Sequence, residues 1–134
     1  MNILLDTNIF LWIAGNDDYL PTAAKKLIEE PSNQIYLSSV SAWEIAIKWS
    51  KGRLGLPEQP RTLIENIADT AGFVKVSVNF SDAHVVSELP VFEDHKDPFD
   101  RLLIAQAMNR GLSLMTSDKK FKQYDIDILL YGKK

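Results

Sequence analysis

The sequence predicts an α/β protein in which helices cover both faces of one mostly parallel sheet of about five strands. Short apolar runs of strand length alternate along the chain with segments of helical periodicity, as in layered α/β folds. The first run, Ile3 to Leu5, has no polar residue at alternate positions, so both faces of this strand are expected to be buried. The connections between strands are long enough for right-handed crossovers. These observations predict a three-layer α/β/α architecture.

Composition predicts a single domain that spans residues 1–134. The chain has 134 residues, of which 46% are hydrophobic, and this is enough to bury a continuous core. It contains no cysteine, which excludes disulfides, thiolate zinc sites and a cysteine nucleophile. Met1 leads directly into the first apolar run, and no apolar run approaches the roughly 20 residues of a membrane span. We therefore expect a cytoplasmic protein with no membrane partner.

The charge balance argues against a protein that binds nucleic acid through a strongly positive surface. The formal net charge is −3 and the sequence pI is about 5.3, so the chain lacks the strong positive field of many nucleic-acid-binding proteins. A nucleic-acid enzyme still fits this balance, because carboxylates gathered in one metal-binding pocket would leave the remaining surface close to neutral.

Two helices and a strand are expected to follow the first strand. Asn8 to Ala14 is a short apolar helix, and Gly15 to Asp18 form a loop after it. Pro21 begins an amphipathic helix in which apolar residues recur at helical spacing between lysines and glutamates. Gln34 to Ser38 is the second strand candidate.

The middle of the chain predicts two further helices and a third strand. Ser41 to Lys51 is rich in apolar residues at helical spacing, and Gly52 is placed to end this helix. Pro60 to Ala71 begins with a proline that favours a first helical position, and Gly72 closes it. The strand candidate Phe73 to Val78 follows directly.

The last third contains the strongest helix start in the sequence. Ser81 to Leu89 is a short helix, and Val91 to Lys96 is a loop. Pro98 to Arg110 is apolar nearly all round, which predicts a buried helix. Two strands are expected after it, Ser113 to Thr116 and Ile126 to Tyr131.

Four acidic residues occupy positions that would meet at one edge of this sheet. Asp6 and Asp118 each come just after a short apolar strand, at the carboxyl edge where open α/β sheets bind ligands. Glu44 and Asp100 lie in the first turns of predicted helices, and such helix starts tend to border the same edge.

Helix capping is an alternative explanation for three of these acids: it is the more common role for an acid placed like Asp6, and it explains Glu44 and Asp100 as well as a functional role does. Asp6 could cap the helix that follows the first strand. Ser41 and Glu44 match the capping-box pattern, in which the two side chains satisfy each other's free backbone donors. Asp97 as N-cap, Pro98 and Asp100 form a helix start favoured by sterics and by the helix dipole. The four acids together are harder to explain by capping.

Carboxylates crowded at a sheet edge resist ionisation unless a cation neutralises them, and an oxygen-only ligand set selects Mg²⁺ or Mn²⁺. Such a site suits hydrolysis of phosphodiesters by a metal-activated water. Asn8 and Thr116 are expected to orient Asp6 and Asp118, although turn-forming and strand roles explain them nearly as well. His95 is interpreted as a loop histidine without a catalytic role.

These residues resemble the PIN-domain family, and in particular its small VapC-type toxins. The resemblance covers nearly the whole chain, and it depends on the order and spacing of motifs that are not specific one by one. The motifs are Leu5-Asp6-Thr7-Asn8, Ser41-Ala42-Trp43-Glu44, Asp97-Pro98-Phe99-Asp100-Arg101-Leu102-Leu103-Ile104-Ala105 and Thr116-Ser117-Asp118.

The resemblance implies a Mg²⁺- or Mn²⁺-dependent endoribonuclease that cuts an RNA substrate. Asp6, Glu44, Asp100 and Asp118 would hold the metal and activate water. Asp97 is an additional acid, which the resemblance leaves as either a ligand or a helix cap. The resemblance also implies a homodimer and a cognate antitoxin whose chain would block the metal site, and exposed apolar residues between Trp43 and Leu56 would suit that partner.

Two other classes of function are also considered. An aspartate after the first parallel strand marks phosphohydrolases that form an aspartyl-phosphate, and receiver-like domains have a similar acidic edge. The phosphohydrolases usually need a second aspartate two residues on, where this chain has Asn8. The third class is a PIN-like binding module that cuts nothing, which we rank below the enzyme because all four expected acids are present.

Overall fold

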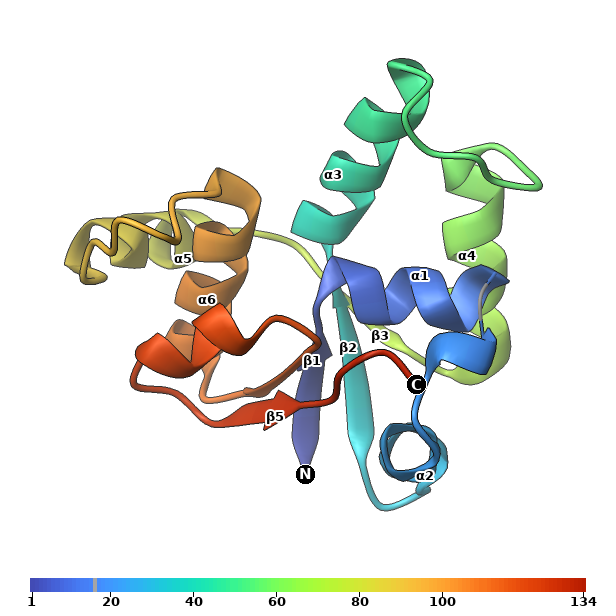
Figure 1. The fold of residues 1–134 in the computed structure, drawn as a ribbon, viewed down its shortest axis with the longest axis horizontal. Coiled ribbons are helices and arrows are strands. Elements are labelled where there is room, and N and C mark those ends of the chain that lie inside the picture. Colours follow the sequence, from blue (N-terminus) through green and yellow to red (C-terminus); the bar gives the residue numbers. More distant parts are fainter. Residues whose placement is uncertain (16) are drawn as a thin grey trace.

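Five parallel strands form one sheet in the order β3-β2-β1-β4-β5 (Figure 1). The computed structural model describes residues 1–15 and 17–134; Asn16, in the expected loop, lies outside the described residues. The first, second and fourth strands agree with the predicted ones, whereas β3 and β5 are shorter than predicted. The strands are β1 (Asn2–Leu5), β2 (Gln34–Ser38), β3 (Val74–Val76), β4 (Ser113–Thr116) and β5 (Ile128–Leu130).

Helices cover both faces of this sheet, which confirms the predicted α/β/α class (Figure 1). The predicted helix Ser81 to Leu89 is a short α-helix followed by one 3₁₀ turn. The α-helices are α1 (Thr7–Gly15), α2 (Thr22–Glu29), α3 (Ser39–Ser50), α4 (Pro60–Ala71), α5 (Phe80–Val85) and α6 (Pro98–Arg110). The 3₁₀ helices are η1 (Asp17–Tyr19), η2 (Val86–Glu88) and η3 (Lys119–Gln123).

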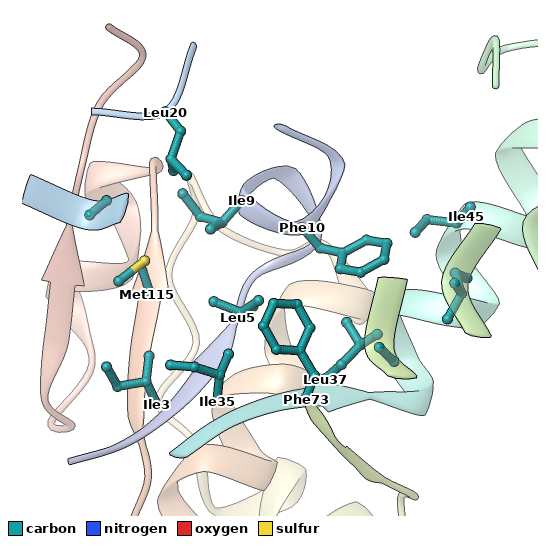
Figure 2. Packing of buried hydrophobic residues seen from close by; sticks show 13 residues of the cluster. Ile3, Leu5, Ile9, Phe10, Leu20, Ile35, Leu37, Ile45, Phe73 and Met115 are labelled. Atoms are coloured by element: carbon teal, nitrogen blue, oxygen red, sulfur yellow. The ribbon is translucent and has the colours of Figure 1, made fainter. Parts of the chain in front are cut away.

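One face of the sheet packs against α1, α2 and α4. Figure 2 shows Ile3 and Leu5 of β1 beside Ile35 and Leu37 of β2, with Phe10 of α1 above them. Because successive residues of a strand point to opposite faces, alternate positions of each strand join this cluster. The opposite face of the same strand therefore carries a second core.

The second core lies between the sheet and α6. Leu4 of β1 and Leu114 of β4 pack with Leu103 and Ile104 of α6, and Phe121 closes this cluster. All five side chains are essentially inaccessible to solvent. The buried strand β1 therefore has apolar side chains on both faces, as its uninterrupted apolar sequence predicted.

Helix α3 begins earlier than predicted, and its cap is a different serine. The helix starts at Ser39, and the Ser38 hydroxyl accepts a hydrogen bond of 3.0 Å from the Val40 amide. Glu44 consequently lies beyond the first turn, and the predicted capping box between Ser41 and Glu44 is wrong. Both serines fit the N-cap pattern, and the end of β2 at Ser38 decides between them.

The chain leaves β1 and returns to β4 on opposite sides of the sheet. The connection from β1 to β2 passes through α1 and α2, whereas β3 is joined to β4 through α5 and α6. The carboxyl ends of β1 and β4 therefore border the crevice at which open α/β sheets bind ligands. Among the described residues, no helix is both long enough and apolar enough to cross a bilayer.

We predict that replacing Ser38 by alanine lowers the free energy of unfolding by about 1 kcal/mol, because the first turn of α3 loses its cap. Urea denaturation measures this change. Ser50→Ala is the matched control, since the exposed Ser50 hydroxyl only donates to the Ile47 carbonyl at the other end of the helix. Equal effects of the two substitutions would contradict the assignment of Ser38 as the cap.

Candidate metal centre and active site

Asp6 is a buried carboxylate at the end of β1. Its amide donates a hydrogen bond of 2.8 Å to the Met115 carbonyl of β4, which continues the sheet pairing. Its Oδ1 accepts from the Thr7 amide at 2.8 Å, and its Oδ2 accepts from the Thr116 hydroxyl at 2.7 Å. Only 5% of the residue is exposed. Two short hydrogen bonds therefore fix the orientation of this carboxylate.

Thr116 joins Asp6 to Asp118. The Thr116 hydroxyl donates to Asp6 and accepts a hydrogen bond of 3.0 Å from the Asp118 amide. Asp118 also caps η3, because its Oδ1 accepts from the Lys120 amide at 2.9 Å. A single buried hydroxyl thus couples the loops that follow β1 and β4.

Glu44 reaches the same place from α3. Its Oε2 accepts from Lys48 Nζ at 2.6 Å, one helical turn further on. Ser41, on the preceding turn, is buried and its hydroxyl accepts from the Thr7 hydroxyl at 2.9 Å. This contact ties the first half of α3 to the start of α1, which follows Asp6 directly.

Asp97 and Asp100 come from the start of α6. The Asp97 carboxylate caps this helix by accepting from the Asp100 amide at 3.0 Å. Asp97 nevertheless also faces the cleft in which the other acids lie. The residues that line this cleft are Asp6, Thr7, Asn8, Glu44, Lys48, Asp97, Asp100 and Asp118.

The structure therefore brings together all four acids singled out from the sequence, together with Asp97 and Asn8. Thr116 lies beneath the cleft and acts through Asp6 and Asp118. The geometry leaves the metal-binding role of each acid as a prediction. Asp97, which the sequence left as either a ligand or a helix cap, does cap α6, and it also lines the cleft.

His95 is more than the loop histidine expected from the sequence. It is 3% exposed, and its Nε2 lies 3.1 Å from Asp100 Oδ2 while its Nδ1 lies 2.8 Å from the Tyr124 hydroxyl. One ring nitrogen of His95 and one carboxylate oxygen each of Asp100 and Asp118 fall within 4.8 Å of one another. Because both ring nitrogens already have partners, we interpret His95 as a support for Asp100 rather than as a metal ligand.

Burial and mutual repulsion make two of the carboxyls reluctant to ionise. Burial raises the pKa of Asp6 to about 6, against the hydrogen bonds from Thr116 and Thr7 that lower it. Burial, and after it the negative charge of the surrounding carboxylates, raise the pKa of Asp100 to about 8. Burial lowers the pKa of His95, so this ring stays neutral near pH 7.

The donor set of the cleft fits a hard divalent cation. Its acidic ligand atoms are carboxylate oxygens, and Mg²⁺ and Mn²⁺ prefer such oxygens. Burial first, and then the neighbouring carboxylates, raise the pKa of Asp6 and Asp100, and a cation in the cleft would offset both effects. A bound cation would also favour the ionised forms of these carboxyls.

An aromatic pair spans the two helices that supply Glu44 and Asp100. Trp43 and Phe99 meet edge to face, with ring centroids 4.8 Å apart. Each aromatic residue directly precedes one of the two acids in the sequence, and Trp43 is 55% exposed. This contact connects α3 to α6 beside the cleft.

Sequence reasoning missed three contacts that support this site. The pattern around His95 offered one signal, since this residue lies five positions before Asp100 on the approach to α6. Tyr124 lies 29 residues after His95, and no local pattern links the two. The contact between Thr7 and Ser41 likewise joins distant segments.

A family model describes most of the chain. The model of the PIN domain matches residues 3–127. The chain belongs to the PIN domain family. This match confirms the family resemblance carried by the four acidic motifs.

Similar proteins agree with this assignment. The ribonuclease VapC22 of Mycobacterium tuberculosis is 24% identical over 124 residues, which is 91% of each chain. A VapBC2 complex from Rickettsia felis, bound to a DNA fragment from its promoter, aligns with a TM-score of 0.74 at 18% identity, over 98% of this PIN domain and 100% of that chain. VapBC-5 of Mycobacterium tuberculosis, a member of the VapBC family of toxin–antitoxin systems, aligns with a TM-score of 0.64 at 17% identity. The alignment covers 97% of this chain and 98% of that chain. These structures share the fold of this chain.

We predict that the metal-free protein becomes less stable by about 1 kcal/mol between pH 7 and pH 8. The raised pKa of Asp100 means that the folded state keeps a proton that the unfolded chain has already lost, so stability falls as pH rises toward 8. The neutral His95 acts in the opposite sense, but chiefly below its ordinary pKa of 6.5. Urea denaturation in EDTA at several pH values measures the slope.

The Asp100→Asn variant, which carries no ionisable group at this position, is expected to lose most of this slope. Asp69→Asn, at an exposed position of α4, is the matched control and is expected to keep it. A stability of the wild-type protein that rises between pH 7 and pH 8 would contradict the prediction.

Proposed function

We propose that this PIN domain is a Mg²⁺- or Mn²⁺-dependent endoribonuclease, and the toxin of a toxin–antitoxin pair. The observation that carries the proposal is the convergence of five carboxylates in one cleft at the carboxyl ends of β1 and β4. The similarity to a ribonuclease of Mycobacterium tuberculosis supports RNA as the substrate. Hydrolysis of a phosphodiester is the reaction that such a site suits.

Each acidic residue has a proposed part in this reaction. Asp6, Glu44, Asp100 and Asp118 hold the divalent cation, while Thr116 keeps Asp6 and the loop of Asp118 in place. The cation, when bound, lowers the pKa of a bound water and stabilises charge on the phosphate oxygens. Among the residues of this chain, one of the cleft carboxylates would serve as the base that accepts the proton of the attacking water.

Cationic side chains beside the cleft support a polyanionic substrate. Lys48 lines the cleft, where it is paired with Glu44. Lys119 and Lys120 are exposed directly after Asp118. Phosphates on either side of the scissile bond would interact with these ammonium groups. Binding of the substrate would therefore not require a strongly basic surface, which this chain lacks.

An aspartyl-phosphate mechanism is less well supported. Asp6 is the only acid directly after β1, and both of its carboxylate oxygens already accept short hydrogen bonds. A nucleophile needs an accessible oxygen in line with the phosphorus, whereas a metal ligand can use its remaining lone pairs. The position of Asn8 in the cleft also replaces the second acid that this chemistry usually uses.

Exposed apolar surface supports protein partners, which we propose to be an antitoxin and a second copy of this chain. Leu54, Leu56 and Pro57 form an apolar groove with Leu11 of α1 and Leu63 of α4. The large exposed hydrophobic residues are Met1, Tyr19, Trp43, Trp49, Phe80, Val91 and Leu130. Apolar surface of this kind is more typical of interfaces than of isolated monomers.

We predict that the purified protein, free of antitoxin, cleaves end-labelled RNA in Mg²⁺ or Mn²⁺ and does not cleave it in EDTA. Asp6→Asn and Asp118→Asn are expected to lower the rate by more than about 100-fold, because each replaces a negatively charged ligand by a neutral amide. Asp69→Asn, far along α4, is the matched control and is expected to cut normally. Gel analysis of cleavage products measures the rates.

Cleavage that survives EDTA or persists in Asp6→Asn would contradict the proposal. Intact RNA together with acid-stable, hydroxylamine-labile phosphate on Asp6 would favour the aspartyl-phosphate class instead. Intact RNA together with tight Mn²⁺ binding would favour a binding module.

We also predict that the protein free of antitoxin is a homodimer. Light scattering during size-exclusion chromatography is expected to give twice the 15.2 kDa mass of the chain. A constant mass of one chain at every concentration tested would contradict this prediction.

A further inference from the structure

We infer that His95 is a positioning residue, held by Tyr124 in the tautomer that carries its proton on Nε2, and that it donates this proton to Asp100. The inference rests on the proposed function in one respect, since it gives Asp100 the role of a metal ligand. The direction of the hydrogen bonds, however, follows from the contacts of the protein alone.

The chain of contacts has a donor at one end and an acceptor at the other. Arg101 Nη1 lies 3.2 Å from the Tyr124 hydroxyl, which lies 2.8 Å from His95 Nδ1. His95 Nε2 lies 3.1 Å from Asp100 Oδ2. A guanidinium only donates hydrogen bonds, so the hydroxyl oxygen must accept from Arg101.

The hydroxyl proton of Tyr124 then has one acceptor. Within the part of the chain that the structure describes, His95 Nδ1 is the remaining hydrogen-bond partner of this hydroxyl. Nδ1 must therefore accept, which leaves the ring proton on Nε2, facing Asp100. All four groups are satisfied in this arrangement alone.

The other tautomer, with the proton on Nδ1, would leave one hydrogen bond of Tyr124 unmade. If Nδ1 held the proton, Tyr124 would face two donors and its own proton would have no acceptor. Tyr124 is only 4% exposed, so water gives little compensation for a lost hydrogen bond. The same argument applies to a doubly protonated His95.

Packing holds both rings in this geometry. The His95 ring lies 5.1 Å from the ring of Phe121, and the Tyr124 ring meets Phe92 edge to face at 5.1 Å. Arg101 is fixed at the same time, because it also donates to the Pro90 carbonyl at 2.8 Å. These contacts leave little freedom for the rings to turn away.

The consequence concerns the orientation of Asp100. Asp100 accepts from His95 through Oδ2, and among the described residues no hydrogen bond to its Oδ1 is found, so Oδ1 remains available to a cation in the cleft that Asp100 lines. A neutral donor orients the carboxylate without neutralising it, so the negative charge stays available for a cation. Such supports typically change metal affinity by 10- to 100-fold when they are removed.

The first test needs neither metal nor RNA. The chain has two histidines, so long-range ¹⁵N–¹H NMR spectra of the labelled protein contain two imidazole patterns. At pH 8.5, above the pKa of Asp100, His95 is expected to show a protonated Nε2 and an unprotonated Nδ1. His84→Gln removes the other pattern and assigns the spectrum. A protonated Nδ1 on His95 would overturn the inference.

The second test measures Mn²⁺ binding by titration calorimetry in paired variants. A glutamine amide can take the place of Nε2, whereas an asparagine amide reaches only the place of Nδ1. We expect His95→Gln to bind Mn²⁺ within roughly threefold of the wild type, and His95→Asn to bind about 10- to 100-fold more weakly. Tyr124→Phe keeps the ring and is expected to weaken binding by about 10-fold.

His84→Gln, on the exposed side of α5, is the matched control and is expected to bind Mn²⁺ normally. Equal losses in His95→Gln and His95→Asn, or an unchanged affinity in Tyr124→Phe, would overturn the positioning role. Absence of Mn²⁺ binding by the wild type would overturn both the proposed function and this role. The NMR measurement of the His95 tautomer would still test the direction of the hydrogen bonds, because it needs no metal.

Discussion

The site depends on one electrostatic constraint, which is that five carboxyl groups share a single cleft at the carboxyl edge of the sheet. Burial opposes the ionisation of these groups and their like charges oppose it further, and the raised pKa values of Asp6 and Asp100 express this cost. The fold must hold these groups together against their repulsion. It does so with a strand paired on both sides and with two helices that start at the same edge.

The groups that hold these carboxylates are mostly neutral donors. Asp6 accepts from a threonine hydroxyl and a backbone amide, and Asp100 faces a buried histidine. Among the described residues, Lys48 provides the ion pair within the cleft, on Glu44. Neutral donors orient the oxygens but leave their charge, so the site keeps its attraction for a cation. Beneath the cleft, apolar clusters pack against both faces of β1, the strand that ends at Asp6.

Prediction from the sequence succeeded where local patterns were unambiguous. Helix Pro60–Ala71 and strand Ser113–Thr116 have the predicted bounds, because a proline, a glycine and a break in periodicity mark their ends. It failed at the start of α3, where Ser38 and Ser41 both fit an N-cap. Tertiary contact decides there, since Ser41 is used to bond Thr7 instead. His95 was undervalued for a related reason, because its partner Tyr124 is distant in the sequence.

Periodicity, caps and apolar runs are local properties of the chain, and they were enough to predict the succession of strands and helices, the burial of the first strand and the acids that line the cleft. Packing of distant segments was needed to show that Asp97 and Lys48 line the same cleft, that burial raises the pKa of Asp6 and Asp100, and that Tyr124 contacts His95. Each of these depends on distances between segments that are far apart in sequence. Desolvation and hydrogen-bond direction arise only once those segments are packed together.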